Sequence, residues 1–284
     1  MELAYRLLNV FTVAGDRLSG NPLCVFEDGR GLERERMQAL ARQFNLSETT
    51  FILPPERSDA AASVRIFTPA FELPFAGHPT LGTAHVVRAL TGTGNQVTLE
   101  MKAGLVEVRG EGDRWTLRAT KGPSARVPEA GPDALAAMVG LPPGSVSRPL
   151  WVDTGVEQLV LEVHSAADVH AARPDPTLFA RGGRGPGGGE AMAYVFAEVA
   201  PEEVEARFFF MPGGGVVEDP ATGSACANLG GWLLATGAPL PARRVVAQGA
   251  QVGRPSRLVL DVDVERHIYV TGEVVELGRG KVRL

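Results

Sequence analysis

Short runs of apolar and β-branched residues recur along the whole chain of 284 residues. The runs are separated by turn-forming residues, 34 glycines and 21 prolines. This alternation predicts many short strands joined by turns. The predicted strands cover residues 4–13, 23–26, 49–53, 63–67, 96–101, 105–109, 115–119, 150–152, 158–163, 193–196, 205–210, 244–247, 257–262, 267–271 and 273–277.

Helical periodicity is rarer than strand periodicity. An apolar stripe predicts a helix over Leu32–Phe44, and a short helix is predicted over Asp133–Val139. Two further helices are predicted to begin at Pro79 and Pro220, because proline is favoured at the first helical position. The glycine-rich segment 181–189 lacks the strand-to-helix context of a phosphate-binding motif, so it is predicted to be an ordinary loop.

The two halves of the chain share one pattern. In the first half, Arg65-Ile-Phe is followed, 13 residues after the arginine, by His78-Pro-Thr-Leu-Gly-Thr-Ala. In the second half, Arg207-Phe-Phe is followed, 12 residues after the arginine, by Asp219-Pro-Ala-Thr-Gly-Ser-Ala. Agreement over a strand, a loop and a helix start predicts that a β-rich unit with one central helix is duplicated.

Duplication of this kind predicts an α/β (α+β) protein with two related lobes. The chain is long enough for two lobes of about 140 residues each. The proline- and glycine-rich stretch 122–149 is the predicted boundary. The predicted lobes are therefore 1–125 and 126–284, and a return of the final strands to the first lobe is left open.

Composition and charge exclude several classes of protein. With 44 % apolar and 21 % charged residues, the chain is typical of a packed protein. No apolar stretch approaches the roughly 20 residues of a membrane span, and the N-terminus lacks a secretory signal, so a cytoplasmic location is expected. The net charge of −5 argues against a nucleic-acid partner. Two cysteines, Cys24 and Cys226, cannot form a four-thiolate metal site.

The repeated His/Asp position is a candidate binding site. The residue before a first-turn proline is the N-cap, so His78 and Asp219 are expected at two helix starts. Helix starts bind anions through their backbone N–H groups and the positive end of the helix dipole. A small carboxylate is therefore a candidate ligand. Taken alone, however, Asp-Pro is usually a cap and a single histidine is usually structural, and the repeat makes the two interpretations about equal.

Glu48 is a third residue of interest, because it lies between the predicted helix 32–44 and the apolar strand that follows. By itself such a residue is usually a surface or turn carboxylate. A glutamate that enters a partly buried cleft would instead be able to take and return a proton near neutral pH.

Several segments resemble the signature segments of the phenazine-biosynthesis isomerase (PhzF-like) family, and the resemblance covers essentially the whole chain. It implies a diaminopimelate-epimerase-like fold, in which two lobes each wrap a β-rich barrel around a central helix and hold the site in the cleft between them. It also implies a homodimer that needs no metal or organic cofactor. The segments that carry the resemblance are 16–22, 45–51, 75–84, 153–155, 218–225 and 248–256.

The resemblance also implies roles for single residues. In the phenazine enzyme, the glutamate that matches Glu48 moves a proton between carbons of a dihydro-hydroxyanthranilate. The residues matching His78 and Asp219 assist, so these three residues are the implied catalytic set for a small carboxylate substrate. The implied substrate-binding residues are Gly77, Pro79, Thr222, Gly223 and Ser224.

Two features separate this chain from related proteins. Related racemases use opposed cysteines at the matched helix starts, and here residues 76–78 and 219–221 contain none, which excludes a two-thiol racemisation. After Asp153-Thr-Gly the chain continues Val156-Glu-Gln158, where relatives often carry a basic residue or histidine. This departure concerns the identity of the substrate and not the proton chemistry.

Two other functions stay open on the sequence. The duplicated cleft would also suit a non-catalytic module that binds a small anion or a partner. A hydrolase with Ser224 as nucleophile and His78 as base is the weaker alternative, because the Gly-x-Ser-x-Gly turn of such enzymes is missing.

Overall fold

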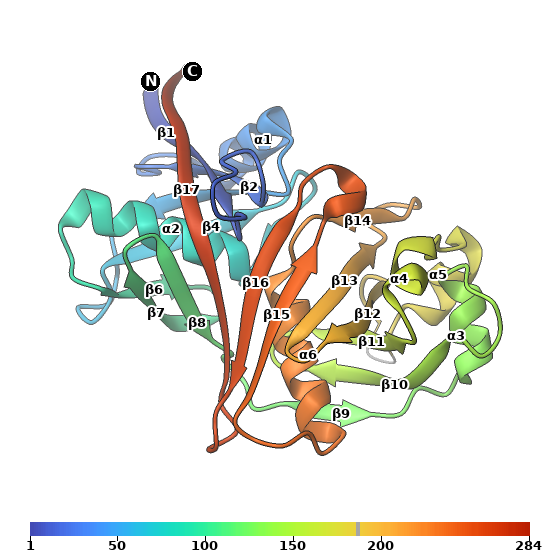
Figure 1. Ribbon diagram of the computed structural model, residues 1–284. Helices are drawn as coiled ribbons and strands as arrows, with labels where there is room; N and C mark the ends of the chain where they lie inside the picture. The colour runs from blue at the N-terminus through green and yellow to red at the C-terminus, as the bar shows by residue number, and fades with distance from the viewer. Residues whose placement is uncertain (186–187) are drawn as a thin grey trace. The chain divides into compact units, whose positions relative to one another are not determined.

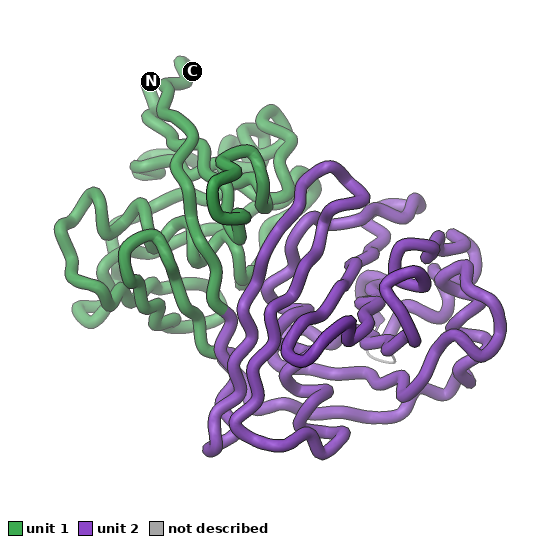
Figure 2. The backbone as a smooth tube through the Cα atoms, in the orientation of Figure 1, with its two compact units in different colours: residues 1–118, 271–284 green, residues 119–270 purple. Residues whose placement is uncertain are grey.

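The computed structural model describes residues 1–185 and 188–284. The chain forms two compact units (Figure 2): unit 1 comprises residues 1–118 and 271–284, and unit 2 comprises residues 119–270. Strand β17 (Ile268–Arg283) carries the chain from unit 2 back into unit 1. Within the described ranges, no helix combines the length and the apolar character that a membrane crossing requires.

Unit 1, which is described throughout, is a closed barrel of eight strands in the order β1-β2-β3-β4-β6-β7-β8-β17, and β17 pairs again with β1 (Figure 1). The pairs β2–β3 and β4–β6 are parallel, and each pair is connected through a helix. The two helices are α1 (Arg34–Phe44) and α2 (Gly77–Thr91). The strands are β1 (Glu2–Val10), β2 (Asn21–Phe26), β3 (Glu48–Leu53), β4 (Ala62–Phe67), β5 (Glu72–Leu73), β6 (Gln96–Met101), β7 (Gly104–Glu111) and β8 (Arg114–Arg118).

Helix α2 fills the barrel of unit 1. It packs against β1, β2, β3, β4, β6, β7 and β8, and its first eight residues are all buried. A Cβ atom at Gly82 would lie 2.5 Å from Leu23 of β2, so glycine is required where the helix meets this strand. Thr83 joins β3 through a hydrogen bond of 2.8 Å with Thr50. Small residues on α2 therefore allow the strands to close around it.

Helix α1 covers the outer face of the strands that flank α2. Met37 and Leu40 of this helix pack into a buried cluster with Phe26, Phe51 and Phe67. The rings of Phe26 and Phe51 are stacked with their centroids 4.8 Å apart. The strands β2 and β3 are thus buried on both faces, which explains their continuous apolar sequences.

Unit 2 repeats this plan around α6 (Gly223–Ala235), which packs against β9, β10, β11 and β16. Its strands follow the order β9-β10-β11-β12-β13-β15-β16, with β11–β12 and β13–β15 parallel. The helices α3 (Pro132–Met138), α4 (Ala166–Ala171) and α5 (Pro176–Gly182) contribute to a second core on the other face of the sheet. The strands are β9 (Ser124–Arg126), β10 (Val146–Asp153), β11 (Glu157–Val163), β12 (Met192–Ala200), β13 (Glu203–Phe210), β14 (Val217–Asp219), β15 (Ala242–Gln248) and β16 (Ser256–Val262).

The predicted duplication is confirmed by topology. The series β4-β5-α2-β6 in unit 1 corresponds to β13-β14-α6-β15 in unit 2, and in both series the first and last strands are parallel neighbours. The short strands β5 and β14 pair antiparallel with β4 and β13. The predicted fold class, two related lobes that each place strands around a central helix, is therefore correct.

Each copy of the repeat also contains the same ion pair. Arg65 of β4 donates to Glu72 of β5 from Nε (2.7 Å) and Nη2 (2.9 Å). Arg207 of β13 donates to Glu218 of β14 from Nε (3.1 Å) and Nη2 (2.6 Å). Both guanidinium groups therefore bind a carboxylate with two parallel hydrogen bonds and fasten the loop that leads into the central helix.

The predicted helix starts are wrong in both units. His78 is not an N-cap, because α2 begins at Gly77, two residues before the predicted start at Pro79, with Ala76 as its N-cap. Asp219 is not an N-cap either, because it ends β14 opposite Phe208, and α6 begins at Gly223. Strand pairing holds Asp219 in an extended conformation, so three residues are needed to turn the chain. Proline is tolerated in α2 because its missing N–H falls in the first turn.

The remaining helix predictions agree in part with the structure. The predicted helices 32–44 and 133–139 correspond to α1 and α3. The helices α4 and α5 were not predicted, since neither shows a clear apolar stripe. The predicted loop 181–189 begins with the last two residues of α5, and its residues 186 and 187 lie outside the described ranges.

We expect the ion pair of unit 2 to matter more for stability than its counterpart in unit 1. The Arg207 side chain is 5 % exposed against 28 % for Arg65, and it also donates to the carbonyl oxygen of Ala172 at 2.7 Å. Replacing Arg207 by lysine should lower the free energy of unfolding by about 3 kcal/mol, since lysine cannot make paired hydrogen bonds to a buried carboxylate. Denaturant unfolding measures the change, and Arg65→Lys is the matched control with an expected loss of about 1 kcal/mol. Equal losses in both variants would contradict this interpretation.

Candidate functional site

Glu48 and His78, far apart in the sequence, meet in unit 1. Glu48 is the first residue of β3, and His78 is the second residue of α2. The Oε2 atom of Glu48 lies 3.3 Å from Nε2 of His78, and the two side chains are only 16 % and 6 % exposed. Glu48 and Thr50 lie on the same face of β3, and Thr50 contacts α2. The closed barrel thus brings the two predicted residues together.

Burial determines the charge of His78. It lowers the pKa of His78 from 6.5 to about 3, while a hydrogen bond to the Pro22 carbonyl oxygen acts in the opposite direction. A neutral ring that donates one N–H to Pro22 leaves the lone pair of its other nitrogen for a second partner. The Glu48 carboxyl group faces the ring at 3.3 Å, so Glu48 is placed to be that partner.

The Asp219 region of unit 2 is a separate cluster of polar groups. The Asp219 carboxylate accepts a hydrogen bond of 2.5 Å from the Thr222 hydroxyl. Gln248 donates to the Asp219 carbonyl oxygen at 2.9 Å and to Thr222 Oγ1 at 3.1 Å. The following residue, Gly249, has a positive φ of 82°, and a Cβ atom there would lie 2.4 Å from the Pro220 carbonyl oxygen. This close approach fixes Gln248 against Asp219.

Gln248 is a residue that sequence reasoning did not single out. It begins the segment 248–256, which contributes to the family resemblance, but nothing in its spacing relates it to Asp219, which lies 29 residues earlier. The signal that was available is the glycine at position 249. A glycine required by close backbone contact often marks a loop held in one place.

The first turn of α6 carries the remaining predicted binding residues. Thr222 is the N-cap, and Gly223 and Ser224 are the first two helical residues. The first helical hydrogen bond of α6 is donated by Cys226 to the Thr222 carbonyl oxygen at 3.0 Å. The amides before Cys226 therefore precede the helical ladder, an arrangement that favours an anion. Ser224 accepts a hydrogen bond of 3.0 Å from Gln158.

The predicted residues thus form two groups, one in each unit. Unit 1 holds Glu48 and His78 together with the buried residues Gly77 and Pro79 at the start of α2. Unit 2 holds the groups around Asp219 and Ser224. That both groups serve one site stays a prediction.

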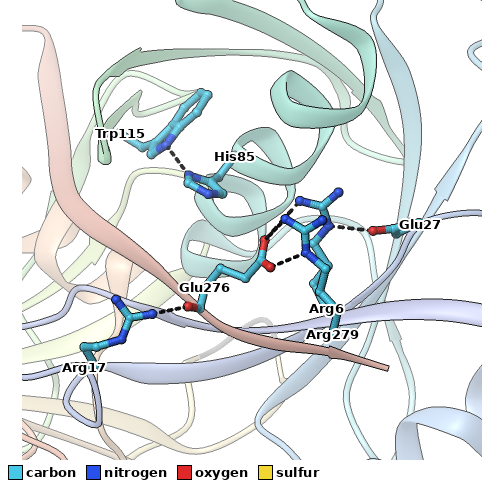
Figure 3. A network of polar contacts seen from close by, with 7 residues as sticks. All are labelled: Arg6, Arg17, Glu27, His85, Trp115, Glu276 and Arg279. Carbon is cyan, nitrogen blue, oxygen red and sulfur yellow. Dashed lines mark hydrogen bonds and ion pairs between the residues drawn. The ribbon is translucent and has the colours of Figure 1, made fainter. Parts of the chain in front are cut away.

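A charged network in unit 1 is explained by structure alone (Figure 3). Arg6 of β1 is 4 % exposed and pairs with Glu27 at 2.6 Å and with Glu276 of β17 at 3.0 Å. Burial opposes the ionised form of Glu276, but hydrogen bonds from Arg279 and Arg6 hold the pKa of Glu276 below its usual value. The Arg6–Glu276 pair connects β1 and β17, and the Arg6–Glu27 pair connects β1 to the residue that follows β2. We therefore assign the network to barrel closure.

One group of potential metal ligands lies on the surface of unit 2, among the residues that the structure describes. It consists of Asp263, Glu265 and His267, all at least partly exposed. Asp263 already accepts hydrogen bonds from the backbone N–H of His267 at 2.8 Å and from the Tyr269 hydroxyl at 3.3 Å. These hydrogen bonds stabilise the turn between β16 and β17 and explain why the three side chains lie close together.

The low pKa of His78 has a consequence for acid stability. Between pH 6.5 and about 3 the unfolded chain binds a proton at this residue and the folded chain does not. Stability should therefore rise with pH across this window and fall as the pH drops. In His78→Asn, which cannot titrate, the midpoint temperature should fall less between pH 7 and pH 4 than in the wild type. Scanning calorimetry measures the midpoint temperature at each pH. The control variant is His164→Asn, because His164 is exposed. An identical acid dependence in the wild type and in His78→Asn would contradict this expectation.

Known proteins are similar to this chain over nearly its whole length. A family model described as "Phenazine biosynthesis-like protein" matches residues 8–280. An uncharacterized isomerase of Pasteurella multocida is 38 % identical over 280 residues, which cover 98 % of this chain and 93 % of that protein. The trans-2,3-dihydro-3-hydroxyanthranilate isomerase of Pseudomonas aeruginosa is 35 % identical over 259 residues, covering 89 % of each chain.

Solved structures support the same fold. A phenazine biosynthesis protein of the PhzF family from Bacillus anthracis superimposes with a TM-score of 0.83 at 22 % identity and covers both chains completely. A hydroxyproline epimerase from Agrobacterium vitis superimposes with a TM-score of 0.66 at 14 % identity, covering 100 % of this chain and 93 % of the epimerase. At these identities the comparison concerns the fold alone.

Proposed function

The chain belongs to the phenazine biosynthesis-like family, and we propose that it is an isomerase that moves a proton within a small carboxylate-bearing substrate. Relatives that cover nearly the whole chain are named isomerases, which supports this class of reaction. A proton shift within one molecule has no net redox change, so the proposed reaction requires no oxidant or reductant.

Glu48 is the proposed acid/base. Its carboxylate would take a proton from one substrate carbon as that C–H bond breaks, while the electron pair moves into the conjugated system of the substrate. The protonated carboxyl would then return the proton to a second carbon. The observation that carries this proposal is the contact of 3.3 Å between the enclosed Glu48 and His78, because a proton held there is shielded from bulk water.

His78 is proposed to hold the position of Glu48 and to share its proton. The ring is buried at the start of α2 and is hydrogen-bonded to Pro22, so its orientation is fixed. A neutral imidazole offers Glu48 a hydrogen-bond partner without adding a permanent positive charge. The lone pair of the second ring nitrogen can accept a hydrogen bond from Glu48 while the carboxyl group carries the proton.

The groups of unit 2 are proposed to bind the polar substituents of the substrate. The first turn of α6, with Thr222, Gly223 and Ser224, suits a carboxylate. Asp219 is held by Thr222 and Gln248 and suits a hydroxyl or amino group, because an ionised carboxylate only accepts hydrogen bonds. At the start of α2 in unit 1, Gly77 and Pro79 are also proposed to be substrate-binding residues.

The first substrate to test is trans-2,3-dihydro-3-hydroxyanthranilate, which relatives at 33–35 % identity are named for isomerising. It carries a carboxylate, an amino group and a hydroxyl group on one small ring. These three groups match the proposed anion site and the acceptor at Asp219. The homodimer that the family resemblance implies stays a prediction.

Substituting Glu48 tests the mechanism directly. In Glu48→Gln the side chain keeps its size but cannot accept a proton, so kcat for the dihydro-hydroxyanthranilate should fall by about 10³-fold, within the usual contribution of acid/base catalysis. Binding of the aromatic analogue 3-hydroxyanthranilate, measured by calorimetry, should change by less than about threefold, because the proposed contacts of the carboxylate lie elsewhere. The control is Glu56→Gln, an exposed carboxylate in the loop after β3.

The same experiment discriminates the alternative of an anion-binding module. A wild-type protein that binds 3-hydroxyanthranilate but converts no candidate substrate into an isomer would support the module. Full activity in Glu48→Gln would remove Glu48 as the base.

A further inference from the structure

A line of buried polar side chains in unit 2 ends at Ser224. The hydroxyl and the backbone N–H of Thr154 both donate to Asn228 Oδ1, at 2.7 and 3.0 Å. Asn228 Nδ2 donates to Gln158 Oε1 at 2.8 Å, and Gln158 Nε2 donates to Ser224 Oγ at 3.0 Å. Asn228 and Gln158 are 0 % and 1 % exposed, so these bonds are enclosed by protein.

Backbone groups fix the direction of every bond in this line. The Thr154 N–H can only donate, so the Asn228 atom that faces it must be the oxygen. The Val156 carbonyl oxygen can only accept, and it lies 2.9 Å from the other terminal atom of Asn228, which must therefore be the nitrogen. Because both ends of the Asn228 amide face backbone groups of opposite kind, this side chain has one possible orientation.

The orientation of Asn228 determines that of Gln158. The nitrogen of Asn228 points at Gln158, so the facing atom is Oε1, and the Gln158 nitrogen is directed at Ser224. An amide nitrogen has no lone pair to offer. Ser224 must therefore accept from Gln158, and its own hydroxyl proton is available for a different acceptor.

Thr222, two residues earlier, provides a contrast. Its hydroxyl proton is directed at Asp219 within the protein, at 2.5 Å. Its oxygen in turn accepts from Gln248 at 3.1 Å. Both hydroxyls at the start of α6 thus accept from a glutamine, but Thr222 donates to a group of unit 2 itself.

We propose that Gln158, held by Asn228, is a positioning residue that commits the Ser224 hydroxyl to donate a hydrogen bond to an acceptor on the substrate. This inference rests on the proposed function, which places Ser224 at the substrate carboxylate. It assigns opposite preferences to two neighbouring groups: Ser224 donates, to a carboxylate or carbonyl oxygen, and Asp219 accepts, from a hydroxyl or amino group. The fixed direction of the hydrogen bonds in this line therefore helps to determine which class of substrate binds and in which orientation.

The line also gives a role to one sequence feature. Thr154 belongs to the segment Asp153-Thr-Gly155 that contributes to the family resemblance, and it is the anchor of the line. A residue of different hydrogen-bonding character at position 158 would change what Ser224 presents to the substrate.

A double-mutant cycle between Gln158 and Ser224 tests the inference. Gln158→Met keeps the length of the side chain but removes the donor, so the Kd of 3-hydroxyanthranilate should rise about 5- to 30-fold, in the range of couplings between contacting residues. In a Ser224→Ala background the same substitution should change Kd by less than about twofold. In turnover the effect should fall on KM more than on kcat, which a general loss of structure would not produce. The exposed Gln251→Met is the matched control.

A second variant keeps the test valid if Gln158→Met fails to fold. Gln158→Glu retains the acceptor for Asn228 but presents an oxygen to Ser224, so the serine hydroxyl would turn toward it. The increase in the Kd of 3-hydroxyanthranilate should then be larger in Gln158→Glu than in Gln158→Met. This increase should disappear when Ser224 is replaced by alanine. Additive effects of position 158 and Ser224→Ala on Kd would overturn the inference while leaving the proposed function intact. Absence of binding and turnover in the wild type would overturn the proposed function and the inference with it.

Discussion

Enclosure of a helix by strands is the constraint on which the rest of unit 1 depends. The barrel closes around α2 only because small residues face the strands, as Gly82 does against Leu23. Closing the barrel also brings β17 beside β1, where Arg6 needs two carboxylates as partners because it is buried. The packing of α2 inside the barrel therefore determines both the small residues on this helix and the charged network between β1 and β17.

The same enclosure changes the chemistry of polar groups at the start of the helix. His78 would titrate near neutral pH on a surface, but in the barrel burial lowers the pKa of this histidine and leaves the ring neutral. A neutral ring beside a glutamate suits proton transfer better than a fixed ion pair would. The feature that stabilises the fold thus also produces the chemical environment that the proposed mechanism uses.

In unit 2, neutral amides provide the hydrogen-bond partners beside the central helix. Polar groups enclosed around α6 must find partners, and Asn228 and Gln158 provide them with a defined direction. The Arg207–Glu218 pair then secures the loop that leads to α6. A duplicated scaffold has therefore placed different chemistry at the start of its two central helices.

The sequence by itself determined the strand-rich fold, the duplication and the residues of interest, because apolar periodicity, glycine positions and repeated motifs are local properties of the chain. It did not determine where α2 and α6 begin, since strand pairing at Asp219 overrides the capping preference of an Asp-Pro pair. It also did not show that Glu48 contacts His78, that Glu72 and Glu218 are equivalent, or that Gln158 orients Ser224. These facts depend on which residues closure of the strands brings together, and only the tertiary structure decides that.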